Sequence, residues 1–191
     1  MLKLNLGCGF NKRQNFINVD IFEGCQPDEC VDLTAGTWPW ADSSADEVVL
    51  EYSLEQMGES KKDLFFVIRE LYRVCAPEAK VSLKVAHPHH DRFTMNPQCV
   101  HPLGPQFMSL LSVSNNLNQI AQGQSDSCLG MMWGVNFKLG PVRFIVGAQF
   151  EEAVRVGKIS EDEVRHLIHS QRNICETIEM EMTVVKSVEG A

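Results

Sequence analysis

A glycine turn followed by a carboxylate, near the start of the chain, is the residue pattern with the clearest chemical meaning. Residues 2–6 alternate apolar and polar side chains, as a short strand does, and end on a Gly-Cys-Gly turn at residues 7–9. Glycine allows the sharp turn that must follow a buried parallel strand, and it leaves the backbone open to a ligand. The next apolar run, residues 16–19, ends on Asp20, which can accept hydrogen bonds from ribose hydroxyls. The pattern therefore predicts a ligand of the NAD, flavin or S-adenosylmethionine type.

The glycine pattern is incomplete for a dinucleotide. In the G-x-G-x-x-G motif, a third glycine lets the following helix pack against the strand beneath a pyrophosphate. Here the turn is followed by Phe-Asn-Lys-Arg at residues 10–13. The missing glycine weakens the prediction of a nicotinamide-dependent oxidoreductase, which we keep as an alternative. The stretch before Asp20 is also too short for a full crossover helix, so we expect a single helical turn or a loop around residues 11–15.

The segment Leu4–Gly9 resembles the first motif of the class I S-adenosylmethionine-dependent methyltransferases. Three further segments are similar to a bacterial subgroup of that superfamily with a shortened first crossover. They are residues 18–20 (Asn-Val-Asp), 32–34 (Asp-Leu-Thr) and 38–42 (Trp-Pro-Trp-Ala-Asp). The resemblance covers residues 2–101 well and the rest of the chain only in general layout.

The resemblance implies a cofactor, S-adenosylmethionine, with S-adenosylhomocysteine as its product. Asp20 would take both ribose hydroxyls, Asp32 would lie near the adenine, and Tyr52 would lie beside the methionine end. For Asp32, capping a turn or a helix is the alternative role. The residues implied to bind the cofactor are Leu6, Gly7, Cys8, Gly9, Asp20, Ile21, Asp32, Leu33, Tyr52 and Ser53.

Two departures from the superfamily's pattern keep a second class of function open. Gln56 stands where a histidine is common, and residues 75–79 lack the two glycines of the usual turn. A catalytically silent protein that binds S-adenosylmethionine or a partner is therefore the alternative to an enzyme. An enzyme would transfer the methyl group in line to its acceptor, a reaction in which positioning alone can lower the barrier by roughly 7–11 kcal/mol.

Four histidines and an aspartate follow the predicted fifth strand: His87, His89, His90, Asp91 and His101. Imidazole groups suit Zn, Fe or Ni, but the spacing matches no dedicated metal motif, and we predict no metal site. A histidine could instead act as the general base for the methyl acceptor, because it titrates near neutrality. The third interpretation is a substrate-facing loop without chemistry. His87 is the catalytic candidate, since it is nearest to the end of the strand.

Composition limits the partners and the compartment. A length of 191 residues favours a single domain, 1–191, with a cofactor-binding half over 1–101 and substrate-side loops, helices and final strands over 102–191. The net charge of −8, without long basic runs, disfavours a nucleic-acid partner and favours a small-molecule acceptor. Seven cysteines without C-x-x-C spacing indicate free thiols in a reducing compartment. With no membrane-length apolar run and no room for a signal peptide, we expect a cytoplasmic protein; its oligomeric state is open.

The periodicity of the chain places the elements that would hold this site. Further strands are predicted at residues 30–33, 47–52, 80–85 and 177–186. The apolar centre of the strand at 47–52 suits a sheet that is covered on both faces. Ser60 starts a helix whose apolar stripe ends at Cys75, before Pro77. The predicted fold class is α/β: a Rossmann-like, mostly parallel sheet flanked by helices, with an antiparallel C-terminal strand.

The second half of the chain is less clearly patterned. Residues 107–111 predict a short helix, and residues 112–128, rich in Ser, Asn, Gln and Gly, predict a mobile loop of the kind that acts as a lid. Residues 131–150 predict a late strand or a hairpin broken at a Gly-Pro pair. Residues 151–175 predict one helix.

Overall fold

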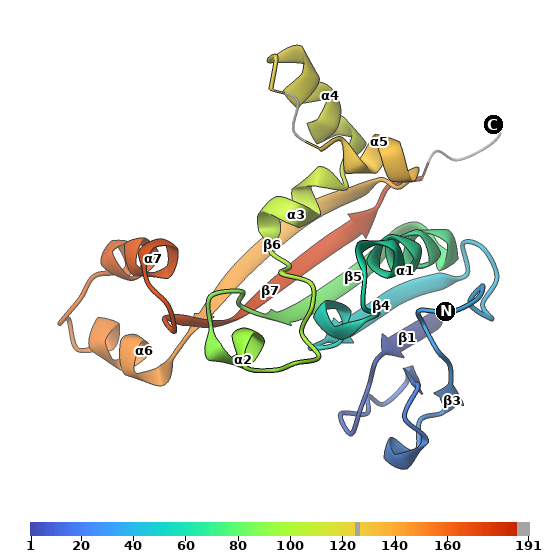
Figure 1. The fold of residues 1–191 in the computed structure, drawn as a ribbon, viewed down its shortest axis with the longest axis horizontal. Helices are drawn as coiled ribbons and strands as arrows, with labels where there is room; N and C mark the ends of the chain where they lie inside the picture. Colours follow the sequence, from blue (N-terminus) through green and yellow to red (C-terminus); the bar gives the residue numbers. More distant parts are fainter. Residues whose placement is uncertain (125–126, 187–191) are drawn as a thin grey trace.

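The structure is a computed structural model that describes residues 1–124 and 127–186. Its central element is a seven-stranded sheet. The strands are β1 (Leu2–Leu6), β2 (Ile17–Asp20), β3 (Glu29–Cys30), β4 (Ala45–Glu51), β5 (Cys75–Ala86), β6 (Phe137–Val146) and β7 (Cys175–Val184). Their order across the sheet is β3-β2-β1-β4-β5-β7-β6 (Figure 1). The first five strands pair in parallel, while β7 pairs antiparallel with both β5 and β6. This arrangement confirms the predicted fold class.

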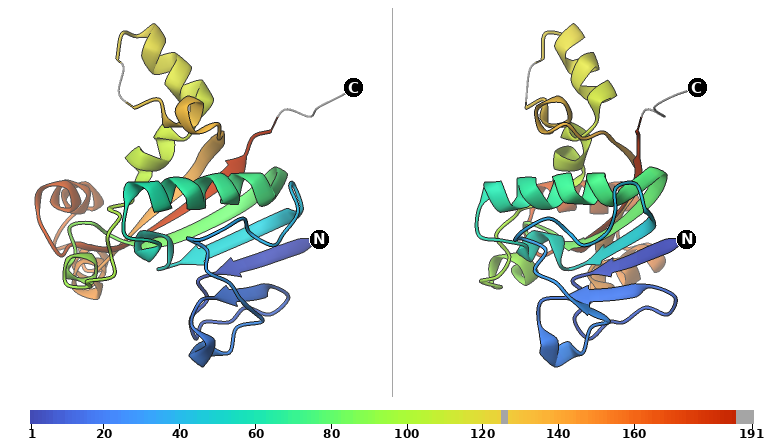
Figure 2. Two further views of the ribbon diagram at one scale, coloured as in Figure 1. Left: turned by 45° about the vertical axis from the view of Figure 1, so that its right-hand side comes forward. Right: turned by 90° about the vertical axis from the view of Figure 1, so that its right-hand side faces the viewer.

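Helices flank the sheet and lie mainly in the second half of the chain. They are α1 (Lys61–Val74), α2 (Asp91–Thr94), α3 (Pro105–Leu110), α4 (Val113–Ala121), α5 (Leu129–Trp133), α6 (Ala148–Arg155) and α7 (Glu161–Ser170), with short 3-10 helices η1 (Glu23–Cys25) and η2 (Leu54–Gln56). Helices α1 and α3 lie over one face of the sheet, and α4 stands away from it (Figures 1 and 2). None of the described helices is both long enough and apolar enough to cross a membrane.

The connection between β1 and β2 is a loop. Residues 7–16, all of them described, contain no helix. The backbone N–H groups of Gly7 and Cys8 both donate to the carbonyl of Val19, at 2.9 and 3.0 Å, which ties the glycine turn to the end of β2. The loop confirms that the first crossover is too short to hold a full helix.

Helix α1 begins as predicted and ends earlier than predicted. Ser60 accepts a hydrogen bond from the backbone of Asp63, and the Asp63 side chain accepts one from the Ser60 backbone, so the capping box is complete. The helix ends at Val74 and β5 begins at once, so Pro77 lies within the strand rather than after the helix. A register shift against β4 accommodates it, and Glu78 there has a φ of 61°.

The two faces of the sheet are covered by different side chains. Leu4, Val48 and Val81 lie in register on neighbouring strands and are fully buried in the core. Val49 points to the other face and is 2% exposed, so the apolar centre of β4 is buried on both sides, as expected. On this second face Val49 shares a small hollow of about 190 Å³ with charged side chains, which include Arg13, Glu51, Lys84 and Arg143. Long charged side chains can cover apolar surface in this way.

Two predictions for the second half of the chain are wrong. Within residues 112–128, the helix α4 replaces the expected mobile loop; Ser112 caps it, and residues 125 and 126 lie outside the described residues. Residues 151–175 contain the second half of α6 and all of α7, instead of one helix. The chain turns between them at Gly157, whose φ is 72°. Of the two alternatives for residues 131–150, the late strand is confirmed and the hairpin is not: the segment holds one strand, β6, which pairs with the distant β7 and shifts register at the Gly-Pro pair.

Candidate functional site

A cleft of about 760 Å³ opens at the carboxyl ends of β1, β2 and β4, and its size suits a nucleotide-sized ligand. All of the residues predicted to bind a cofactor line it, except Leu6 and Cys8, which are buried beside it. In open α/β sheets this edge is the usual position of a ligand. The structure therefore brings the sequence-predicted residues into one cleft.

Close packing explains the first glycine of the turn. Gly7 has a φ of 68°, and a Cβ added to it would lie 2.4 Å from Cβ of Ser53. Ser53 is held in this position because its hydroxyl donates to the carbonyl of Leu6 at 2.9 Å. Only glycine fits here, so β1 and the start of η2 can meet at the floor of the cleft.

The second glycine is open toward the cleft. Gly9 has a φ of 48°, and no atom lies within 4 Å of the position that a Cβ would take. Its N–H donates to Oδ2 of Asp20 at 2.7 Å, and the N–H of Phe22 donates to Oδ1 at 2.9 Å. These bonds fix the carboxylate at the edge of the cleft, and each oxygen keeps a further lone pair for a ligand.

Asp32 has the alternative role that the sequence allowed, in addition to its place in the cleft. Its Oδ1 accepts hydrogen bonds from the N–H and the hydroxyl of Thr34, at 2.8 and 2.7 Å, which makes it the cap of a turn. Strand β3 is only two residues long, so Asp32 and Leu33 follow the strand rather than forming part of it. Leu33 is 5% exposed and lines the cleft with its buried side chain.

Tyr52 is held in an unusual backbone conformation. Its φ is 52°, in the left-handed region that a bulky residue seldom adopts. Its hydroxyl lies 2.9 Å from Oγ1 of Thr177 and accepts a hydrogen bond from Arg92 at 2.9 Å. The Arg92 guanidinium also lies over the Tyr52 ring, 4.7 Å from its centroid. Contacts from β7 and α2 therefore orient this aromatic side of the cleft.

The loop after α2 forms the remaining wall. Pro97 and Gln98 line the cleft, and the loop is fixed because the N–H groups of Val100 and His101 donate to the carbonyl of Glu55. The Glu55 side chain is 1% exposed, and its Oε1 accepts from the N–H of Ala86 at 2.9 Å. Burial raises the pKa of the Glu55 carboxyl. Glu55 thus ties η2 to the end of β5 and to the loop after α2.

His87 lies outside the residues that line the cleft. Its ring packs against those of His89 and Phe144, and its Nδ1 accepts from the N–H of His89 at 3.2 Å. Burial, together with the nearby charges of His89, His90 and His169, lowers the pKa of His87 to about 4. The ring is therefore neutral near pH 7. The catalytic role of His87 stays a prediction.

Several residues of the cleft were not predicted from the sequence. They are Phe22, Val31, Thr34, Gln56, Met57, Gly58, Glu59, Pro97, Gln98 and Val100. One signal was present: Phe22 directly follows the predicted residue Ile21, and both side chains are more than half exposed although they are large and apolar. Two exposed apolar residues after a strand that ends in an acid favour contact with a ligand.

Solved structures with the same fold include methyltransferases. A methyltransferase from Archaeoglobus fulgidus that depends on S-adenosylmethionine superposes with a TM-score of 0.61 over 95% of this chain and 85% of that chain, at 14% identity. Another from Methanosarcina mazei has a TM-score of 0.55 over 97% and 92%, at 12% identity. The [4+2]-cyclase SpnF has a TM-score of 0.53 over 97% and 74%, at 13% identity. The sequence matches no protein-family model and no curated protein.

These similarities establish the fold. The chain has the Rossmann-like fold of the class I S-adenosylmethionine-dependent methyltransferases. Because a cyclase shares this fold, the fold does not determine the reaction, and the activity has to be argued from the residues of the cleft. The resemblance to a bacterial subgroup stays a prediction.

Proposed function

We propose that the protein is an S-adenosylmethionine-dependent methyltransferase that acts on a small-molecule acceptor. The observation that carries the proposal is the cleft itself, where the open turn at Gly9 and the carboxylate of Asp20 meet at one edge of the sheet. A ligand can approach the backbone at Gly9 closely, because no side chain fills the space above it. The missing pyrophosphate glycine argues against a dinucleotide in the same position.

Each wall of the cleft would bind a different part of the cofactor. The two oxygens of Asp20 would accept hydrogen bonds from the ribose hydroxyls. Leu33 offers a buried apolar surface for the adenine, next to Asp32. Tyr52 and Gln56 would border the methionine end. When bound, S-adenosylmethionine supplies an electrophilic methyl group on a positively charged sulfur.

The residues of this chain would act mainly by positioning the two reactants. Tyr52 is held by Arg92 and Thr177, so the side of the cleft that would face the methyl group has a fixed shape. Ordering two reactants in line can lower a barrier by roughly 7–11 kcal/mol, and many methyl transfers therefore need no strong base. A small acceptor fits the net charge of −8, which disfavours a polyanionic nucleic acid.

Ligand-dependent melting separates this function from its two alternatives. S-adenosylhomocysteine at a hundred times its dissociation constant contributes about 2.7 kcal/mol, which raises the melting temperature of a protein of this size by roughly 5–10 °C. We expect that shift with S-adenosylhomocysteine and none with NAD. A shift with NAD alone would favour the oxidoreductase. A shift with S-adenosylhomocysteine, but no transfer of labelled methyl groups to small molecules of a cell extract, would favour the silent binding protein.

A pair of glycine variants tests the cleft against a matched control. Gly7 and Gly36 both have a φ of 68°, so alanine introduces the same backbone strain at each. Only at Gly7 would the new Cβ meet Ser53; at Gly36 nothing lies within 4 Å. We expect Gly7→Ala to abolish the melting shift with S-adenosylhomocysteine and Gly36→Ala to retain it. Equal shifts in the two variants would contradict the proposed position of the cofactor.

A further inference from the structure

Three side chains of the types that bind metal ions converge beside the cleft. The Sγ atoms of Cys8 and Cys25 and a carboxylate oxygen of Asp20 all lie within 4.8 Å of one another. They come from three different segments: the glycine turn, the helix η1 and the end of β2. The cluster was not predicted, because the spacing of these residues in the sequence matches no metal motif.

Both thiols are enclosed and only weakly held. Cys8 is 5% exposed and Cys25 is 4% exposed. Their Sγ atoms lie 3.4 Å from the carbonyl of Gly9 and 3.0 Å from the carbonyl of Phe22. A thiol is a weak hydrogen-bond donor, so little is lost when these two contacts are exchanged for bonds to a metal ion.

The separation of the three atoms suits one small divalent ion. A tetrahedral Zn²⁺ site has Zn–S bonds of about 2.3 Å and Zn–O bonds of about 2.1 Å, which places its ligand atoms roughly 3.5–4 Å apart. The three atoms lie within 4.8 Å of one another and are therefore close to that spacing. Two thiolates and a carboxylate give a ligand set that prefers zinc to magnesium or calcium, and three protein ligands leave a fourth position open.

Asp20 belongs to this cluster and to the cofactor cleft at the same time. Its two oxygens already accept hydrogen bonds from the backbone at Gly9 and Phe22, so few lone pairs are left. A metal ion that binds one of these lone pairs leaves fewer of them to accept hydrogen bonds from ribose hydroxyls. Zinc and the cofactor would therefore compete for one carboxylate.

We propose that Cys8, Asp20 and Cys25 bind one Zn²⁺ ion, and that this ion antagonises binding of the cofactor. On binding, the two thiols release their protons to solvent, and two thiolates and one carboxylate surround the dication. The first part stands on the geometry of the cluster alone. The second part rests on the proposed function, since it requires that Asp20 binds the cofactor.

Zinc titration of the reduced, chelator-treated protein tests the site without any cofactor. We expect the wild type to bind one equivalent of Zn²⁺, and we expect Cys8→Ser and Cys25→Ser each to lower the affinity for zinc by more than about tenfold. Cys30→Ser is the matched control, because Cys30 lies near Cys25 in the sequence, at the end of β3, but is exposed and lies outside the cluster. Titration with Co²⁺ should show thiolate-to-metal absorption that Cys8→Ser and Cys25→Ser reduce and Cys30→Ser does not. Melting curves of the metal-free variants test whether they fold.

No zinc uptake by the wild type, or the same uptake in the Cys8 and Cys25 variants, would overturn the site. If the protein, after reduction and re-exposure to air, has a mass lower by two hydrogens and Cys8 is joined to Cys25, the two cysteines form a disulfide instead of a metal site.

The antagonism is measured as the affinity for S-adenosylhomocysteine with chelator and with one equivalent of zinc. We expect zinc to lower it by about tenfold in the wild type and not to change it in Cys25→Ser. Equal wild-type affinities would refute the antagonism, whereas no binding even with chelator would refute the proposed function and leave the zinc titration to decide the metal site.

Discussion

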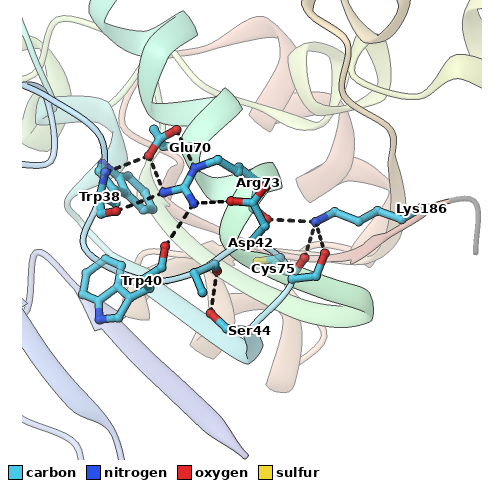
Figure 3. Close-up of polar contacts among 10 residues, drawn as sticks. Trp38, Trp40, Asp42, Ser44, Glu70, Arg73, Cys75 and Lys186 are labelled. Carbon is cyan, nitrogen blue, oxygen red and sulfur yellow. Dashed lines mark hydrogen bonds and ion pairs between the residues drawn. The ribbon is translucent and has the colours of Figure 1, made fainter. Parts of the chain in front are cut away.

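The two edges of the sheet use their polar side chains in opposite ways. At the amino edge, the Arg73 guanidinium donates to both oxygens of Glu70 at 2.7 and 2.9 Å, to Asp42 at 2.6 Å, and to the carbonyls of Trp38 and Trp40 at 3.0 Å each (Figure 3). A guanidinium has five N–H donors, and all of them are used here. The network is closed, and no donor is left for a ligand.

Lys186 completes this closed edge. Its ammonium donates to the hydroxyl of Ser43 and to the carbonyls of Arg73 and Cys75, at 2.9, 2.9 and 2.6 Å (Figure 3). These three bonds join the end of β7 to the start of β4 and β5. The amino edge thus connects segments that are distant in the sequence, which is a structural role.

The carboxyl edge keeps its polar groups available. Asp20 and Asp32 accept hydrogen bonds from backbone N–H groups and a threonine hydroxyl, and among the described residues no cationic side chain donates to either. The carboxylates are therefore oriented but not neutralised. The same residue types thus contribute to stability where their hydrogen bonds are complete, and they stay available to a ligand where a lone pair is free.

Removing the centre of the closed network should have the largest effect on stability. Arg73→Met leaves the buried Glu70 carboxylate with only the N–H of Trp38 as a donor and removes the donors to two backbone carbonyls, which we expect to lower the free energy of unfolding by about 3–5 kcal/mol. Urea denaturation measures it. Arg165→Met is the control, because Arg165 forms exposed ion pairs with Glu161 and Asp162 and should change stability by less than about 1 kcal/mol. Similar losses in the two variants would show that the closed edge has no special role.

At the open edge, a charge-removing variant should affect binding rather than folding. Asp20→Asn loses the charge and keeps an acceptor for only one of the two backbone N–H groups, at Gly9 and Phe22. Hydrogen bonds to charged groups contribute about 1.5–3 kcal/mol, so the affinity for S-adenosylhomocysteine should fall roughly tenfold to a hundredfold. Calorimetric titration in the presence of a chelator measures it. Asp46→Asn is the control at the amino edge, where Asp46 accepts from the N–H of Leu2. Unchanged affinity in Asp20→Asn would mean that the carboxylate does not face the ligand.

The sequence predicted the open edge better than the closed one, for a physical reason. The sharp turn after β1 requires glycine at residues 7 and 9, and Asp20 directly ends the next strand. Both features depend on a short stretch of backbone, so a short stretch of sequence reveals them. Arg73 and Asp42 meet only because α1 and the segment before β4 pack together, and no local pattern announces that pairing. The cluster of Cys8 and Cys25 was missed for the same reason.

The helices of the second half show a second limit of the sequence. The segment of α4 is polar and rich in Asn and Ser, which predicted a loop, because these residues compete with helical hydrogen bonds. In the structure the same residue types support the helix: Ser112 caps its start, and the buried amide of Asn116 donates to the carbonyl of Leu110 and accepts from the N–H of Met131. Tertiary partners at this position reverse the local preference.

Two buried glutamates should make the two edges respond oppositely to pH. Hydrogen bonds from Arg73 hold the pKa of Glu70 below its ordinary value of 4.5, so its contribution to stability is complete above that value and is lost as the pH falls through the lowered pKa. Burial raises the pKa of Glu55, partly offset by the N–H of Ala86 and the charge of Arg92. Its contribution is complete below 4.5 and is lost as the pH rises through the raised pKa.

Glutamine variants at these two positions measure the contrast. Relative to the wild type, Glu70→Gln should lose stability near pH 7 and lose less in acid, whereas the stability of Glu55→Gln should rise from acid to neutral pH. Urea denaturation at several pH values between about 3.5 and about 7.5 gives both differences. If the two differences change with pH in the same direction, the edges do not differ in the way their hydrogen bonds indicate.

Substitution of His87 should have the smallest effect of these variants. It tests whether the functional part of the carboxyl edge extends beyond the cleft to the histidine segment. If His87 were the general base, His87→Ala would lower the methyl-transfer rate by about 10²–10⁴. The ring lies outside the cleft, its Nδ1 already accepts a hydrogen bond from His89, and its pKa is lowered to about 4. The remaining nitrogen, Nε2, therefore carries the proton of the neutral ring and cannot accept another. We expect a change of less than about twofold in kcat/KM between about pH 6 and about pH 9, because positioning rather than proton removal limits the rate. A loss of the larger size would mean that the ring turns toward the acceptor when the cleft is filled, and that the open edge includes the histidine segment.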